Sequence, residues 1–178
     1  SFMITVTGGH RMECKIVEKP AFYLAGVSKR VPMQYEGVNH AIVELAMSST
    51  QEQRDEMHAL QNLEPYHVVN ASYNADAGFI KEEGDLTHLI GVLTTDDGAS
   101  KLLEKVRVEA CTWAVFPNEG PFPSALQSTM ARIYAEWLPA SDYELIDAPG
   151  FSFTKMDENK KGYAYSEVWT PVQKKQTL

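Results

Sequence analysis

The sequence predicts an α+β fold in which two strand-helix-strand-strand units, related by a pseudo-twofold axis, form two antiparallel sheets with helices around a central ligand groove. Its 178 residues, 44% of them hydrophobic and 22% charged, are typical of one globular domain. Apolar side chains alternate in some segments, as in strands, and recur every three or four residues in others, as in helices. Both halves of the chain place these segments in the same order, which is a weak repeat of elements and not of letters.

Two strands open the first half. Apolar residues alternate with polar or small ones over residues 2–6, which predicts a short strand ending at the Gly8-Gly9 turn. The segment 14–31 has the composition of strands apart from an interruption at Pro20.

Two helices come next in the predicted order. The first has one apolar stripe at helical spacing, formed by Val38, Ala41, Ile42 and Leu45. Thr50 followed by Gln53 is a capping-box pattern, so a polar helix is expected from there to about Leu63. Two strands, 68–73 and 88–95, then flank an acidic loop.

The second half restates this order. Residues 106–116 predict one long strand, ended by a cluster of turn residues at 117–121. Ser124 with Gln127 is a second capping-box pattern, and the helix should stop at Pro139. Its apolar stripe contains Leu126, Met130, Ile133 and Trp137, so Trp137 is expected in the core. Three further strands are expected at 143–146, 151–156 and 163–172.

Charge and cysteine content limit the possible partners. With 24 acidic and 16 basic residues the net charge is -8, which disfavours nucleic-acid binding by this chain alone and favours a neutral or cationic ligand. Cys14 and Cys111 are too few for a disulfide framework, so we expect a reducing cytoplasm. No apolar run approaches the roughly 20 residues that span a bilayer, so no membrane partner is expected.

Metal and cofactor motifs are missing from the sequence. The five histidines show neither HxH nor HExxH spacing, and Asp96-Asp97-Gly98 is better interpreted as a turn than as a calcium loop. The chain contains no GxGxxG, GxxxxGK or GxSxG pattern. We therefore expect no metal and no cofactor.

The strand 163–172 is the most informative segment for function. Alternation puts one carboxylate among large aromatic side chains on one face: Tyr163, Tyr165, Glu167 and Trp169. Burying this face in a dry core would isolate a charge, and exposing it would leave the aromatic rings in water. A ligand-pocket wall is therefore favoured over a sheet face whose glutamate pairs with a lysine.

Other aromatic residues are weaker candidates for the ligand site. Trp113 fits a second pocket wall and a buried core position equally well. Tyr134 lies off the stripe of its helix and could point into the groove, while Tyr35 and Phe122 precede the main helices and could close its ends.

Three segments together carry a resemblance to a known family. They are Thr112-Trp113-Ala114-Val115-Phe116 leading to Gly120-Pro121, the helix end Ile133-Tyr134-Ala135-Glu136-Trp137-Leu138-Pro139, and Tyr165-Ser166-Glu167-Val168-Trp169-Thr170-Pro171-Val172. Over residues 12–174 the chain resembles the GyrI-like small-molecule-binding domain, the effector-binding domain of AraC-type transcriptional regulators.

The resemblance implies a duplicated fold with a ligand groove between its halves and Glu167 in the binding pocket. It also implies that residues 1–11 form a strand and linker to a helix-turn-helix region absent from this chain, through which DNA would be bound. Residues 175–178 are expected to be a loose tail.

Two functions from different classes follow. The first is a sensor whose multidrug-type groove admits a planar, apolar or cationic compound. The second, implied by family members that resemble this chain, is a hydrolase that opens the strained cyclopropane ring of DNA-alkylating antibiotics. Its catalytic residues would be Glu167 as general base and Tyr165. A third interpretation is an interaction module that inhibits a partner protein.

Overall fold

The structure, a computed structural model, consists of two compact units. Unit 1 comprises Ser1–Lys19 and Cys111–Leu178, and unit 2 comprises Pro20–Ala110. The residues that the structure describes are 2–5, 11–34, 37–77 and 83–176.

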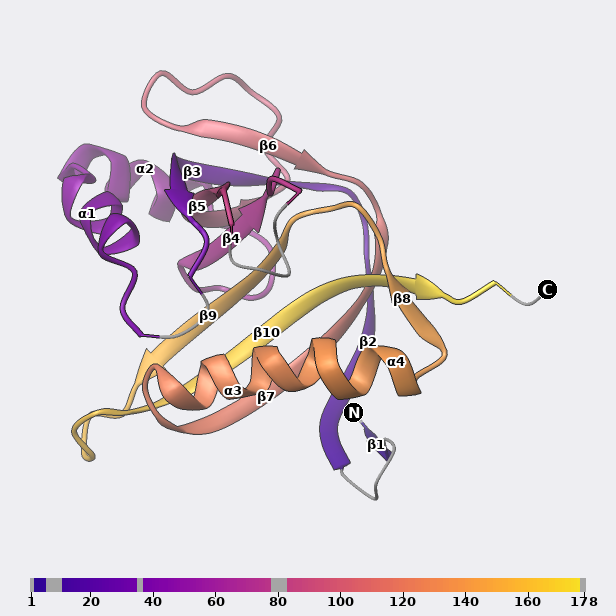
Figure 1. Cartoon of the computed structure of the whole chain (residues 1–178). Helices are drawn as coiled ribbons and strands as arrows, with labels where there is room; N and C mark the ends of the chain where they lie inside the picture. The colour runs from indigo at the N-terminus through magenta and orange to yellow at the C-terminus, as the bar shows by residue number, and fades with distance from the viewer. Residues whose placement is uncertain (1, 6–10, 35–36, 78–82, 177–178) are drawn as a thin grey trace. The chain divides into compact units, whose positions relative to one another are not determined.

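Unit 2 is a four-stranded antiparallel sheet in the order β4-β5-β3-β6. Its strands are β3 (Phe22–Pro32), β4 (Val69–Tyr73), β5 (Asp85–Thr94) and β6 (Glu104–Val108). Helices α1 (His40–Ser48) and α2 (Gln51–Leu60) lie on β3 and β5 (Figure 1). Helix α2 and the sheet share a core that contains Ala25, Met57, Val92 and Leu103.

Both helices of unit 2 begin at side-chain caps. The side chain of Asn39 accepts a hydrogen bond from the backbone of Ala41. Thr50 and Gln53 form the reciprocal bonds of a capping box, as the sequence predicts. The second helix ends at Leu60, earlier than the expected Leu63, where Gln61 caps it through Met57.

Unit 1 contains the sheet β1-β2-β7-β10-β9, which is antiparallel throughout, and β8 also pairs with β10. The strands are β1 (Phe2–Thr5), β2 (Arg11–Lys19), β7 (Cys111–Pro121), β8 (Tyr143–Leu145), β9 (Gly150–Met156) and β10 (Tyr163–Lys174). One helical segment accompanies them: α3 (Ser124–Arg132), the π-helix η2 (Ile133–Trp137) and α4 (Leu138–Ala140).

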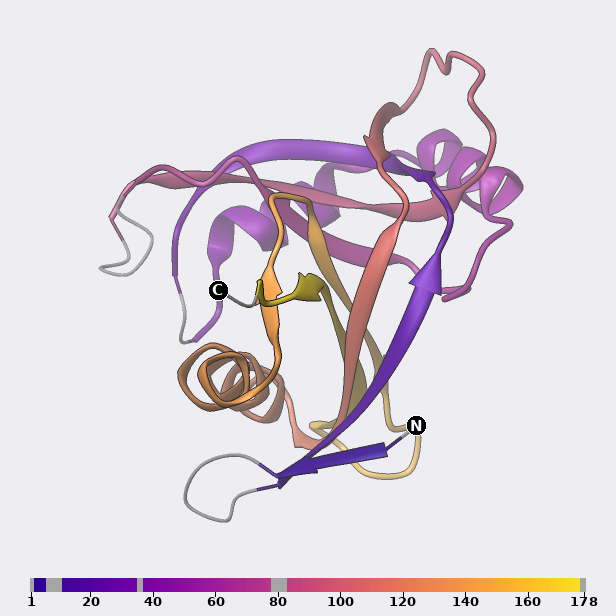
Figure 2. The same ribbon diagram turned by 90° about the vertical axis from the view of Figure 1, so that its right-hand side faces the viewer.

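This helical segment covers one face of the unit 1 sheet. Figure 1 shows it along the strands, and Figure 2 views it nearly end-on as the orange coil. Phe116 and Val168 point to it from neighbouring strands and pack with Ile133 and Trp137 in one core cluster. Because side chains alternate along a strand, the neighbours of Phe116 and Val168 lie on the opposite face. Trp137 is fully buried, as expected.

The predicted repeat is confirmed within the units. In unit 2 the chain runs β3, helices, β4 and β5, and the strands pair in the order β4-β5-β3. In unit 1 it runs β7, helices, the short β8, β9 and β10, and the three long strands pair in the order β9-β10-β7. The same three-strand pairing order therefore occurs in both units, and the fold is α+β. The groove expected between the halves stays a prediction.

The expected single strand over 106–116 is wrong. Glu109 and Ala110 separate β6 from β7, and the two strands belong to different units. The turn expected at 117–121 is also wrong, because β7 continues to Pro121 in register with β10. Strand β2 pairs only with residues 111–115 of β7, so Pro117 lies past the end of that pairing. A proline, which has no backbone N–H to donate, is tolerated at such an edge position.

Two predicted helix boundaries also need correction. Ser124 is the first helical residue and donates to the carbonyl of Pro121, so it does not form the expected cap with Gln127. Pro139 does not stop the helix, which continues through Ala140. The backbone N–H of Leu138 donates to the carbonyl of Ile133, five residues back. This π-turn changes the helical hydrogen-bond pattern from i−4 to i−5 just before Pro139.

Candidate functional site

Strand β10 brings the predicted aromatic-acid face together on the side of the unit 1 sheet away from the helix. Glu167 lies opposite Pro117 on β7 and Phe153 on β9, while Trp169 lies opposite Val115 and Phe151. Residues directly opposite in antiparallel strands share a face, so these side chains form adjacent rows.

The carboxylate of Glu167 is held from both sides along its own strand. The hydroxyl of Tyr165 donates to Oε2 at 2.6 Å, and the indole Nε1 of Trp169 donates to Oε1 at 3.1 Å. The three side chains are two residues apart in sequence, so the alternation of the strand alone brings them together. Glu167 is half-buried, and both donors that fix its orientation are neutral.

An aromatic cluster supports the Trp169 end of this row. Trp169 stacks on Phe151 at 5.4 Å between ring centroids, and Trp113 contacts Phe151 at 5.1 Å and Trp169 at 6.3 Å. Trp113 is fully buried, and Trp169 is 4% exposed. The cluster fixes the indole that donates to Glu167.

A hollow of about 550 Å³ lies beside Tyr165 and Glu167. We call it the acidic hollow; its lining consists of Glu13, Cys14, Lys15, Val115, Pro117, Asn118, Glu119, Tyr165 and Glu167. Three of these residues carry a carboxylate and one carries an ammonium group, so the formal charge of the lining is negative.

The phenol of Tyr165 responds to this charge. Its pKa is raised above the ordinary value of 10.0, first by burial, then by the hydrogen bond and charge of Glu167, and further by Glu13 and Glu119. All three carboxylates therefore act on one point in the hollow. A negative potential at an aromatic wall favours a cation, above all a weakly hydrated organic one.

The remaining predicted residues lie elsewhere. Tyr163 is half-buried at the start of β10, with Nζ of Lys160 3.6 Å from its ring centroid. Tyr134 is 45% exposed on η2, which covers the other face of the sheet, and Phe122 is 42% exposed just before α3. Tyr35 lies outside the described residues. The structure thus brings Tyr165, Glu167 and Trp169 together. Of the predicted residues that it describes, only Tyr165 and Glu167 line the acidic hollow, and Tyr163, Trp113, Trp169, Tyr134 and Phe122 do not.

Sequence reasoning missed the contributions of β2 and of the end of β7. Glu13 and Lys15 come from β2, and Glu119 lies opposite Tyr165 where a turn was expected. Only the pairing of β2 with β7 and of β7 with β10 places these charges beside Glu167. The sequence did contain one signal for this: Glu13, Lys15 and Val17 are two residues apart, so they lie on one face of a strand.

Two further kinds of feature are absent from the part of the chain that the structure describes. It holds no group of three or more histidine, cysteine or acidic side chains close enough to bind a metal ion. Among the same residues, no helix has the length and apolar character required to cross a membrane.

Comparison with known families identifies the chain. Residues 12–173 match the family model described as the GyrI-like small molecule binding domain, and the chain belongs to this family. A search among curated proteins gives no significant match.

Three solved structures share the fold at low identity. SAV2435 bound to tetraphenylphosphonium is 18% identical, with a TM-score of 0.67 over 91% of this chain and 94% of the other. EcmrR, solved in a DNA complex, is 14% identical, with a TM-score of 0.61 over 91% of this chain and 57% of the other. A hydrolase from Listeria innocua is 14% identical, with a TM-score of 0.50 over 91% and 92%.

Proposed function

We propose that this chain is the effector-binding domain of an AraC-type transcriptional regulator of the cytoplasm, and that its ligand is a planar, apolar or cationic compound held at Glu167. One observation carries the proposal: a half-buried carboxylate, fixed by Tyr165 and Trp169, faces a hollow whose lining carries a net negative formal charge. A cation in that hollow gains charge complementarity and aromatic contact at once.

The comparisons support a ligand of this kind. Tetraphenylphosphonium, the compound bound to SAV2435, is a bulky apolar cation. EcmrR is longer than this chain, and its structure contains DNA. In our proposal a helix-turn-helix domain outside this chain binds DNA, and the ligand acts by shifting the population of two conformations of the regulator.

Titration of a panel of planar cationic dyes against wild type and Glu167→Gln tests the proposal. Affinity in the micromolar range, about -8 kcal/mol, is typical of such sites. We expect Glu167→Gln to bind cationic dyes at least about tenfold more weakly, because the variant keeps the shape of the side chain and loses its charge. Glu158→Gln, in the exposed hairpin turn before β10, is the matched control. Equal affinities for wild type and Glu167→Gln would remove Glu167 from the site.

A hydrolase that opens cyclopropanoid antibiotics is the second candidate, because the same pair of residues suits it. Glu167 would accept a proton from water as the water oxygen attacks a ring carbon, and the breaking ring bond would deliver its electrons to the conjugated carbonyl. Tyr165 would orient the substrate or donate a hydrogen bond. A carboxylate has about four acceptor positions, so the two bonds to Glu167 leave room for the water.

Mass spectrometry of ring-opened product separates the two candidates. The enzyme would convert a cyclopropanoid faster than buffer does, and Glu167→Gln would lose this acceleration. No acceleration by the wild type would exclude the hydrolase and leave the sensor.

A further inference from the structure

The acidic hollow lies where β2 and β7 separate. The pairing of these strands ends at Lys15 and Val115. Past that point, consecutive residues of both strands line the hollow: Glu13, Cys14 and Lys15 on β2, and Pro117, Asn118 and Glu119 on β7. Because successive side chains of a strand point to opposite faces, consecutive residues line one hollow only where it opens between the strand edges. The hollow therefore extends from Glu167 into the gap between β2 and β7.

Two hydrogen-bond donors in this lining have no partner among the described residues. The ammonium group of Lys15, a half-buried residue, forms no ion pair with any of the three carboxylates of the hollow and no hydrogen bond. Nδ2 of Asn118 is buried and lacks an acceptor in the same part of the chain. Since a buried donor without an acceptor costs free energy, an acceptor that enters the hollow gains from both groups.

The strand register separates Lys15 from Glu167. Lys15 lies opposite Val115 on β7, while Glu167 on β10 lies opposite Pro117, two residues further along β7. Strand β7 thus runs between the strands that carry the two charges, which puts their backbones roughly 10 Å apart. The hollow holds its positive and negative groups at separate places.

We propose that the acidic hollow selects a zwitterion: an aromatic cation whose positive charge lies beside Glu167 and whose carboxylate is held by Lys15 and Asn118. This inference rests on the proposed ligand-binding function and specifies its class of ligand. A simple cation satisfies Glu167 and leaves both donors without an acceptor. A ligand with two separated charges satisfies all three groups, and its carboxylate forms charge-assisted hydrogen bonds.

The test compares N-carboxypropyl acridinium, a zwitterion near neutral pH, with its methyl ester, a cation of nearly the same shape. Fluorescence titration measures both affinities. Wild type should bind the zwitterion at least as tightly as the ester, although the hollow as a whole is acidic. Lys15→Met keeps the apolar stem and removes the charge, so it should weaken zwitterion binding roughly three- to thirtyfold and leave the ester bound equally well or more tightly. Lys15→Arg should keep the wild-type preference.

Two further variants separate contact from overall charge. Asn118→Asp replaces a donor by a carboxylate of the same shape and should also weaken the zwitterion relative to the ester. Lys155→Met is the matched control, because Lys155 is exposed opposite Tyr165 on β9 and does not line the hollow. It should change the ratio of the two affinities less than about twofold.

Three results would overturn the zwitterion proposal: a wild type that prefers the ester, an equal loss of both ligands in Lys15→Met, or the same change of ratio in Lys155→Met. Failure of the proposed function gives a different result, because ester binding would then not depend on Glu167. Ester binding that Glu167→Gln weakens, together with zwitterion binding that Lys15→Met leaves unchanged, would refute this inference alone.

Discussion

The hydroxyl of Tyr165 donates to the carboxylate of Glu167 over 2.6 Å, between residues two positions apart on one strand. An isolated extended strand would bring the same two side chains to one face. The fold places two further carboxylates beside this pair, Glu13 from β2 and Glu119 from β7. A local pair thus becomes part of a charged site through strand pairing.

This surrounding charge predicts the titration of Tyr165. We expect Glu167→Gln to lower the pKa of the phenol towards 10.0, because the variant removes an anionic acceptor. The pKa should stay above that value, since burial is the largest cause of its shift. NMR of the ring carbon that carries the hydroxyl, assigned with Tyr165→Phe, measures it. Identical titration in wild type and Glu167→Gln would contradict the coupling.

The direction of this pKa shift determines how the stability of the fold depends on pH. The folded state holds the phenol proton more tightly than the unfolded state does. The stabilisation is therefore complete below pH 10.0 and is lost as the pH rises through the folded-state pKa. Glu167→Gln should reduce this loss in the alkaline range.

His88 gives a second pH dependence, in unit 2 and of opposite direction. The side chain is 6% exposed; its Nε2 lies 2.8 Å from Oδ1 of Asn70 and its Nδ1 lies 3.5 Å from Oγ of Ser72. Lys29, paired with Glu44, lies opposite it on β3. Burial lowers the pKa of His88 from 6.5 to about 4.

Unit 2 should therefore lose stability in mild acid. Between pH 6.5 and about 4 the unfolded chain binds a proton at His88 that the folded chain does not. The free energy of unfolding should fall by roughly 3 kcal/mol across this range from His88 alone. His88→Gln keeps a polar group and should flatten this part of the profile. Urea unfolding at several pH values measures it, and parallel profiles would exclude His88 as the cause.

The close approach of β3 and β5 predicts an intolerant glycine. Gly26 and Gly91 lie opposite each other, and a Cβ on Gly91 would overlap the carbonyl of Ala25 on the neighbouring strand. Backbone cannot move aside as a flexible side chain can. We expect Gly91→Ala to destabilise unit 2 by roughly 3 kcal/mol or more.

Gly37→Ala is the control for this change. Its φ of 76° penalises a side chain, but its new Cβ would meet nothing nearer than a side-chain atom of Gln34 at 3.6 Å. The expected cost is about 1 kcal/mol, from backbone conformation alone. Circular dichroism during urea unfolding compares the two, and similar losses would disprove the steric explanation.

Local signals in the sequence predicted those features that depend on few residues. The Thr50–Gln53 capping box and the core position of Trp137 follow from spacing within one helix. The row of Tyr165, Glu167 and Trp169 follows from alternation within one strand. Each of these arrangements is decided by neighbours along the chain.

The wrong predictions concern segments whose structure depends on pairing with strands distant in sequence. Residues 106–116 contain no glycine or proline, so nothing local marks the break at Glu109 and Ala110 between the two units. Pro117 and Gly120 are typical turn residues, but pairing with β10 keeps them extended. Glu13 and Lys15 reach the site only because β2 pairs with β7, which is distant in sequence.

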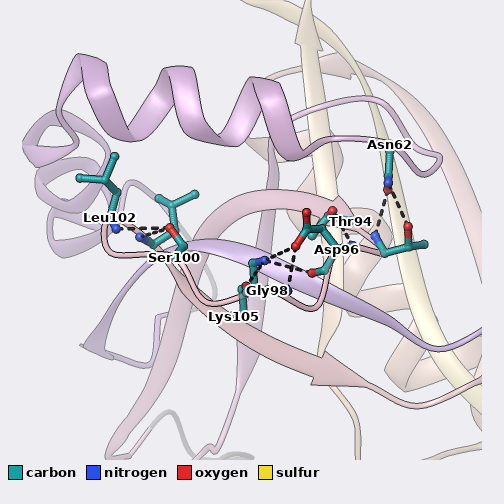
Figure 3. A network of polar contacts seen from close by, with 9 residues as sticks. Asn62, Thr94, Asp96, Gly98, Ser100, Leu102 and Lys105 are labelled. Atoms are coloured by element: carbon teal, nitrogen blue, oxygen red, sulfur yellow. Dashed lines mark hydrogen bonds and ion pairs between the residues drawn. The ribbon is translucent and has the colours of Figure 1, made fainter.

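The last prediction concerns the β5–β6 connection, where the ammonium group of Lys105 donates to the oxygens of a turn. Figure 3 shows Lys105 among oxygens of Asp96 and Gly98. Its Nζ lies 3.0 Å from both the backbone carbonyl and Oδ1 of Asp96. The pKa of Asp96 is lowered, first by its hydrogen bond with Lys105 and then by the N–H of Gly98. The turn is therefore held by an internal cation.

Lys105→Met should loosen this turn without unfolding the unit. The pKa of Asp96 should rise towards 3.8, and the Gly98 amide, which donates to Oδ1 of Asp96 at 2.8 Å, should exchange its hydrogen faster. The stabilisation from Asp96 is present above pH 3.8 and is lost as the pH falls, so wild type should approach the variant in acid. Lys101→Met, an exposed change of equal charge, should leave exchange at Gly98 unchanged. Equal exchange in Lys105→Met and wild type at neutral pH would show that the backbone alone holds the turn.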